Sequence, residues 1–95
     1  MNKTAMYREK IEALIKDWKT KFGELDEKAS RATGETKAEL VKALGELRQK
    51  NEVFKEKWSA LQKESGAAWE SMRAGVEKAA VELKEAVDKV MARFK

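Results

Sequence analysis

Residues 30–39 read Ser-Arg-Ala-Thr-Gly-Glu-Thr-Lys-Ala-Glu, and they decide whether the N-terminal half of the chain is one helix or two. Gly34 is the candidate hinge, because glycine adopts the backbone conformations that end a helix at little cost. Thr36 and Glu39 have the spacing of a capping box, which satisfies free backbone amides at a helix start. If Gly34 instead stays helical, residues 4–63 form one helix about 90 Å long.

Turn signals are otherwise sparse in this chain of 95 residues, which contains no proline, no cysteine and no histidine. Without proline, the strongest helix breaker, glycine and capping residues must mark every turn. A second turn is predicted at 64–66, where Ser65 can cap the following helix and Gly66 supplies the bend. The other glycines lie between good helix formers, and we interpret them as tolerated inside helices, where they permit close helix approach. They are Gly23, Gly45 and Gly75.

Apolar residues recur every three or four positions from one end of the chain to the other. The average step is about 3.6 residues, which is the period of an α-helix, and no alternating strand pattern competes with it. This apolar stripe consists of Tyr7, Ile11, Leu14, Trp18, Phe22, Leu25, Ala29, Ala32, Leu40, Leu44, Leu47, Phe54, Trp58, Leu61, Ala68, Met72, Val76, Ala79, Leu83, Val87, Val90 and Phe94. It keeps its phase across three polar positions, which are Thr36, Asn51 and Ser65.

The expected fold is all-α, in one domain covering residues 1–95. One form is an antiparallel coiled-coil bundle of three helices near 4–32, 36–63 and 66–95. The other is a long helical hairpin that dimerises by swapping, in which two antiparallel copies cover each other's exposed half-stripe. In both forms the stripe is buried, so a lone extended monomer is not expected.

Composition excludes most catalytic and metal chemistry. The absence of histidine and cysteine removes the commonest general base, the thiolate nucleophile and the commonest metal ligands. No phosphate-binding loop, nucleophile elbow or dinucleotide motif is present. Acidic groups such as Glu24, Asp26 and Glu27 are interpreted as solvated helix surface. We therefore expect no enzyme activity, no catalytic residue, no cofactor, no metal and no small-molecule substrate.

Charged residues make up 40% of the chain, and 21 basic against 17 acidic residues give a net charge of +4. The excess is spread evenly, whereas nucleic-acid-binding proteins concentrate basic residues on one face or in one run, so no nucleic-acid partner is expected. Glutamate and lysine often stand four residues apart, as Glu24 and Lys28 do, a spacing that lets a helix surface pair them. No signal peptide or membrane span is recognisable, and a soluble, cytoplasmic protein is expected.

The three tryptophans, Trp18, Trp58 and Trp69, are predicted to be core or interface anchors rather than a ligand cage. Together with Phe54 they would provide a helix groove or a self-association face. Asn51 lies on the stripe opposite Trp18 in an antiparallel register. Two interpretations are open: a buried asparagine that fixes register and partner number, bonded to the indole N–H, or a solvated residue at the edge of the stripe.

Four segments carry a resemblance to a known family: Tyr7–Trp18, Ser65–Glu70, Ala74–Ala79 and Met91–Lys95. With them the chain resembles small bacterial coiled-coil proteins described as stress-response proteins. In that family the stretch matching residues 30–38 is rich in alanine and lysine and helical, so Thr33 and Gly34 depart from the pattern. The resemblance implies a helical, non-enzymatic protein and carries no binding site over to this chain.

The expected function is therefore that of a structural or interaction protein linked to stress response. It would act through helix–helix association, with a second copy of itself or with another helical protein as the partner. One alternative is reversible binding to a lipid surface through the amphipathic segment 67–95, which carries Trp69 and Phe94 beside several lysines. The other alternative is self-assembly into helical fibres through staggered, non-closing contacts.

Overall fold

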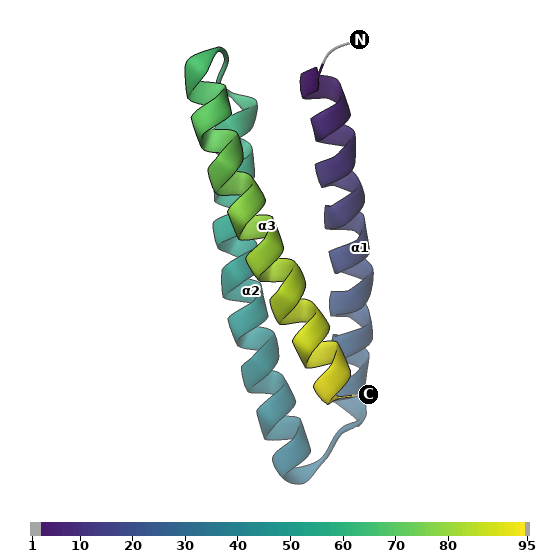
Figure 1. Cartoon of the computed structure of the whole chain (residues 1–95). Coiled ribbons are helices and arrows are strands. Elements are labelled where there is room, and N and C mark those ends of the chain that lie inside the picture. The colour runs from purple at the N-terminus through teal and green to yellow at the C-terminus, as the bar shows by residue number, and fades with distance from the viewer. Residues whose placement is uncertain (1–2, 95) are drawn as a thin grey trace.

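A computed structural model describes residues 3–94 and shows three long helices joined by two short turns (Figure 1). The helices are α1 (Lys3–Arg31), α2 (Gly34–Gln62) and α3 (Ala67–Arg93). The chain reverses direction at each turn, so α1 and α3 run parallel to each other and antiparallel to α2 (Figure 1). The all-α helical bundle expected from the sequence is confirmed, and the chain breaks before Gly34 instead of continuing as one helix over residues 4–63.

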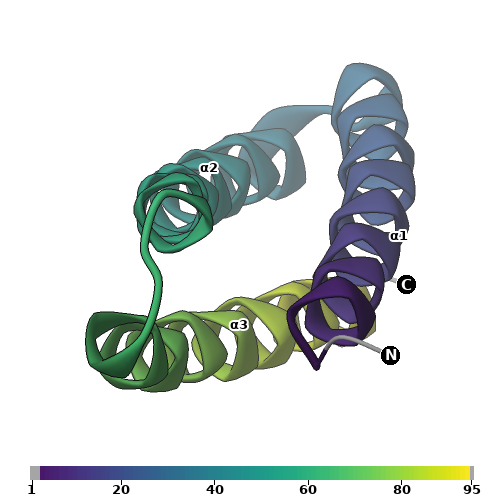
Figure 2. The same cartoon turned by 90° about the horizontal axis from the view of Figure 1, so that it is seen from above.

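The three helices do not pack equally. α2 and α3 form the most closely packed pair, and α1 lies against this hairpin with fewer contacts. α3 begins beside the end of α2 and crosses the bundle so that its last turn lies beside the second half of α1 (Figures 1 and 2). The molecule is elongated, with extents of 51 × 20 × 17 Å, as expected for helices that each span most of its length.

The core follows the apolar stripe. Nearly every stripe position is buried or half-buried, and the exceptions are Ala68 and the polar positions Thr36 and Ser65, which are exposed. Ala80 is a buried residue outside the stripe. The buried set is Ile11, Trp18, Leu25, Ala29, Leu40, Leu44, Leu47, Phe54, Leu61, Val76, Ala80, Leu83 and Val87. The helical period therefore identified the side of each helix that faces the core.

The first turn does not contain the capping box that was predicted from Thr36 and Glu39. α2 begins at Gly34, whose φ of +62° lies in the left-handed region that favours glycine. Thr33 precedes it in an extended conformation, and its side chain makes no capping hydrogen bond. Thr36 and Glu39 therefore lie inside α2, so the capping-box prediction was wrong. The left-handed glycine turns the chain sharply enough for the helix to start two residues earlier.

The second turn also lacks the predicted cap. Gly66, with a φ of +67°, occupies the position before α3, and no side-chain hydrogen bond caps this helix, so the prediction that Ser65 does so was wrong. The backbone N–H of Trp69 instead bonds to the Gly66 carbonyl at 3.2 Å. The idea of close helix approach at the remaining glycines was wrong too, because a Cβ at Gly23, Gly45 or Gly75 would meet nothing within 4 Å.

Candidate functional site

The side of α1 that faces the α2–α3 hairpin is lined by regularly spaced apolar residues. Ile11, Trp18 and Leu25 are spaced seven residues apart, which places them on one side of a helix, and each is at most 2% exposed. Tyr7, Leu14 and Phe22 are half-buried and pack around this row. α1 thus presents a continuous apolar ridge to the α2–α3 hairpin, in the manner of an amphipathic helix that binds in a groove.

Trp18 forms the centre of this face. Its ring meets that of Phe54 on α2 edge to face, with centroids 5.0 Å apart and planes at 85°. This is the favoured geometry of an aromatic pair, because the positive ring edge faces the negative ring face. Trp18 and Phe54, expected to be core or interface anchors, therefore lie between α1 and the hairpin and not on the outer surface of the bundle.

Trp58 and Trp69 lie at the other end of the α1 interface, where α2 ends and α3 begins. The ring of Tyr7 packs edge-on against both, with centroid distances of 6.1 Å to Trp58 and 5.8 Å to Trp69. Tyr7 thereby joins α1 to both helices of the hairpin. Trp18 is eleven residues further along α1, about 16 Å at the helical rise, so the three tryptophans do not converge on one ligand cage.

Arg73 completes this aromatic cluster. Its guanidinium lies 5.7 Å from the Trp69 ring centre and 6.0 Å from that of Tyr7. It also pairs with Glu70 at 2.9 Å and Glu77 at 3.0 Å. Sequence reasoning placed Tyr7 on the stripe without a functional role and did not single out Arg73. The position of Arg73, one helical turn after Trp69, was the signal available for it.

The cluster buries polar atoms. The Tyr7 hydroxyl and the Arg73 Nε are buried without a hydrogen-bond partner among the described residues. Burial of the hydroxyl raises the pKa of Tyr7 to about 12, and the nearby Glu77 carboxylate adds to this rise while Arg73 opposes it. The phenol of Tyr7 therefore keeps its proton to a higher pH in the folded chain than a solvent-exposed tyrosine does.

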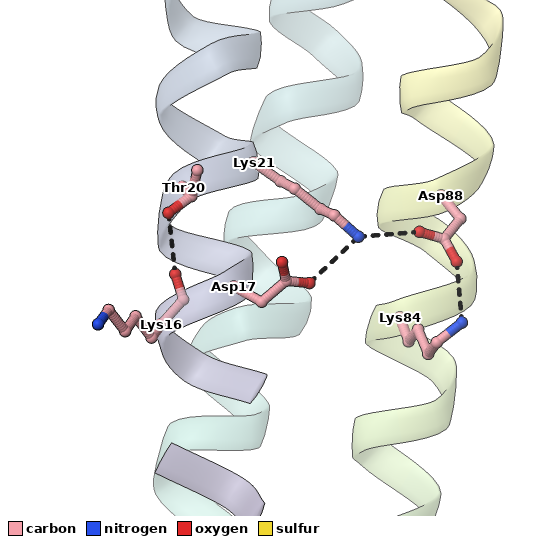
Figure 3. Close-up of polar contacts among 6 residues, drawn as sticks. All are labelled: Lys16, Asp17, Thr20, Lys21, Lys84 and Asp88. Carbon is pink, nitrogen blue, oxygen red and sulfur yellow. Dashed lines mark hydrogen bonds and ion pairs between the residues drawn. The ribbon is translucent and has the colours of Figure 1, made fainter. Parts of the chain in front are cut away.

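A chain of charged residues connects the middle of α1 to α3 (Figure 3). The ammonium of Lys21 lies 3.2 Å from Asp17 on its own helix and 3.4 Å from Asp88 on α3. Asp88 in turn pairs with Lys84 at 3.1 Å. Hydrogen bonding by Lys84, with Lys21 nearby, lowers the pKa of Asp88, and hydrogen bonding to Asp17 raises that of Lys21. These groups are largely solvated, so each pair contributes about 0–1 kcal/mol to stability.

Further polar contacts join the second half of α1 and the end of α3 to their neighbouring helices. Lys28 on α1 donates a 2.7 Å hydrogen bond to the Phe94 carbonyl at the end of α3. Arg93 pairs with Glu39 on α2 at 3.0 Å. Arg48 on α2 pairs with Asp26 on α1. The end of α3 thus contacts both helices that flank the first turn.

Open grooves border α1 on both sides. The α1–α3 groove, of about 460 Å³, is lined on its α1 side by Tyr7, Lys10, Ile11 and Leu14 and on its α3 side by Glu77, Ala80, Val81 and Lys84. The α1–α2 groove, of about 530 Å³, runs between the Ile15–Phe22 stretch and the Arg48–Lys55 stretch. Asn51 lines this second groove together with Trp18 and is half-buried, which agrees with the interpretation as an edge residue and not as a buried one.

The acidic residues of α1 that the sequence placed on the helix surface lie there in the structure. Glu24, Asp26 and Glu27 are exposed, and within residues 3–94 no group of three acidic side chains is placed to hold a metal ion. None of the three described helices is both long and apolar enough to span a membrane.

Comparisons of the chain with protein families, with curated proteins and with solved structures found no match.

Proposed function

We propose that this protein is a non-enzymatic helix–helix interaction protein, in which the α2–α3 hairpin is the receiving face and α1 is its resident helix. One observation carries this proposal. A ridge of fully buried anchors on α1 contacts a closely packed hairpin, while open grooves flank α1 on both sides. The partner is a helical protein, either a second copy or another chain.

The energetics of the interface support a helix that docks and can be replaced. Burial of each large apolar anchor contributes about 1.5–3 kcal/mol, whereas each solvated ion pair between α1 and the hairpin contributes at most about 1 kcal/mol. The attachment of α1 therefore depends on an apolar ridge with heptad-like spacing. Another amphipathic helix with the same spacing offers the same contacts, and this is how helix-in-groove interfaces recognise their ligands.

A stress-response setting is part of this proposal and rests on the family resemblance of the sequence. A bundle of this kind suits that setting, because an interaction that requires release of α1 responds to conditions that weaken apolar packing. The cytoplasmic location expected from the sequence stays a prediction.

The proposal is tested by adding a fluorescently labelled peptide with the sequence of residues 3–32 to the full-length protein. We expect fluorescence anisotropy to report binding, and to report tighter binding when the resident helix is weakened by Ile11→Ala, because that change removes apolar contacts without touching the hairpin. The matched control peptide carries Trp18→Asp and Leu25→Asp. Equal signals from both peptides, or no binding to an Ile11→Ala variant that circular dichroism shows to be helical, contradict the proposal.

A second candidate function is reversible binding to a lipid surface through α3. Its support is an apolar side that runs the length of the helix, with Val76, Leu83 and Val87 fully buried. Those side chains face the core, so lipid binding would require the bundle to open. Flotation with anionic vesicles at low salt tests this candidate. Recovery of the protein with the vesicles supports it, and absence of the protein from the floating fraction removes it.

A further inference from the structure

The turn between α1 and α2 is short, and no side chain caps the start of α2. Only Ala32 and Thr33 lie between the two helices, and Gly34 then reverses the chain with its φ of +62°. α1 is extended by one backbone hydrogen bond, from the Ala32 N–H to the Lys28 carbonyl at 2.9 Å. α2 starts without a side-chain cap. Several backbone groups at these two helix ends are thus left to solvent.

A straightened turn would satisfy those groups. The chain has no proline, and the residues on either side of Gly34 are compatible with a helix. The apolar stripe also keeps its phase across the turn, passing from Ala32 through Thr36 to Leu40. A continuous helix from the start of α1 to the end of α2 would therefore carry both halves of the stripe on one side.

We propose that two copies of this chain exchange their α1 helices. In the exchanged dimer the turn at 32–34 straightens, and α1 of each copy docks on the α2–α3 hairpin of the other. The inference rests on the proposed function, because it takes the hairpin as a receiving face and names its occupant as α1 of a second copy.

The contacts within one chain specify this occupant. In the exchanged dimer Trp18 would pack on Phe54 across copies, and Tyr7 would pack between Trp58 and Trp69. Exchange keeps each of these contacts and changes only the turn. The charges match as well, because Asp26 with Arg48 and Lys21 with Asp88 pair α1 with opposite charges on both helices of the hairpin.

The antiparallel geometry permits the exchange. α1 is antiparallel to α2 within one chain (Figure 1). Two straightened α1–α2 helices would therefore lie antiparallel, with each α1 half beside the α2 half of the other copy. Each half-stripe is covered, and the assembly closes with two-fold symmetry at two chains.

Gly34→Ala tests the hinge directly, with molar mass measured by light scattering over a range of protein concentrations. Alanine is strained at a φ of +62° but favoured in a continuous helix. Because a dimer contains two such turns, we expect its association constant to rise on the order of 100- to 1,000-fold. Insertion of Gly-Ser-Gly after Thr33 should have the opposite effect, because the added glycines disfavour a continuous helix and a longer hinge loop disfavours exchange.

Gly45→Ala is the matched control. It makes the same change inside α2, where the added Cβ meets nothing within 4 Å, and it should leave the association constant unchanged. A Gly34→Ala protein that stays monomeric at every concentration overturns the inference but not the proposed function, because binding of the α1 peptide does not require the hinge. Equal dimerisation of the insertion variant and the unmodified chain also overturns it.

Crosslinking distinguishes exchange from side-by-side association. The chain has no cysteine, so one copy with Lys21→Cys and another with Asp88→Cys can be mixed, refolded together and treated with a short thiol crosslinker. Exchange predicts a covalent heterodimer through this pair and none when Ser65→Cys, at the far end of the bundle, replaces Asp88→Cys. Similar yields from both pairs indicate intact bundles in random contact, and growth of mass without a plateau indicates open fibres. Either result overturns the closed dimer.

Discussion

Tyr7 is the residue through which α1 contacts both helices of the hairpin at the aromatic end. The apolar stripe placed it on the core side of its helix, and the structure agrees. The sequence could not show that its ring meets Trp58 and Trp69 or that Arg73 lies beside it, because these residues come together only when three separate helices pack. Periodicity identifies the side of a helix, and packing decides the neighbours.

The raised pKa of Tyr7 gives a pH prediction. In the folded chain this phenol titrates near pH 12, whereas in the unfolded chain it titrates near its ordinary value of about 10. Between these values the folded state holds a proton that the unfolded state has lost, so stability is present below pH 10 and falls as the pH rises toward 12. After a discount for the part-exposed ring, we expect a loss of about 1–2 kcal/mol.

Tyr7 is the chain's only tyrosine, so the absorbance of tyrosinate reads its titration directly. Urea unfolding at a series of pH values measures the accompanying loss of stability. Tyr7→Phe should reduce the slope of stability against pH above pH 10, while the titration of lysines remains as a shared background. A titration of the native protein at the ordinary tyrosine value would contradict this prediction.

At the scale of the element, the sequence predicted the buried sides of the helices and the turn at 64–66, and it left open whether residues 4–63 form one helix or two. It failed at the helix caps. Both predicted caps, Thr36 with Glu39 and Ser65, were wrong, because a cap contributes only about 1 kcal/mol and a left-handed glycine can start the helix elsewhere. Surface pairs were equally hard to predict. Lys28 was matched with Glu24, yet it bonds to the Phe94 carbonyl, which only tertiary packing brings within reach.

Some glycines lie inside helices and others have a positive φ, and substitution by alanine should change stability in opposite directions at the two kinds of position. Gly45→Ala should raise the free energy of unfolding by about 1 kcal/mol, because alanine favours the helix and the added Cβ meets no neighbour. The same holds for Gly23 and Gly75. Gly66→Ala should lower it by about 1–2 kcal/mol, because its φ of +67° strains an L-residue. Urea unfolding measures both effects, and a loss of stability at position 45 would refute this division.

At the scale of the whole molecule, the sequence left two arrangements open, and the choice depended on one turn. A bundle and an exchanged dimer bury the same stripe with the same contacts, so no pattern of apolar residues can distinguish them. The difference lies in the backbone at Gly34, which the structure places in the left-handed region. Which of the two forms predominates also depends on protein concentration, and the sequence does not encode that concentration.

The unequal packing of the bundle predicts unequal opening. Native-state hydrogen exchange should show the amides of α1 exchanging faster than those at the centres of α2 and α3, because release of α1 breaks fewer contacts than separation of the hairpin. Mass spectrometry of peptides around Trp18 and around Phe54 provides the comparison, since both side chains are fully buried. Equal protection of the two regions would show that the bundle opens only as a whole.

The position of the last turn of α3 has a practical consequence for labelled protein. Lys28 bonds to Phe94, and Arg93 pairs with Glu39, so this end of α3 lies beside the first turn of the chain. An affinity tag or fluorescent protein fused after α3 would crowd the segment that the proposed exchange straightens. A fusion at the N-terminus would instead stand next to Tyr7 and the aromatic cluster. Assays of assembly therefore require both fusions, or none.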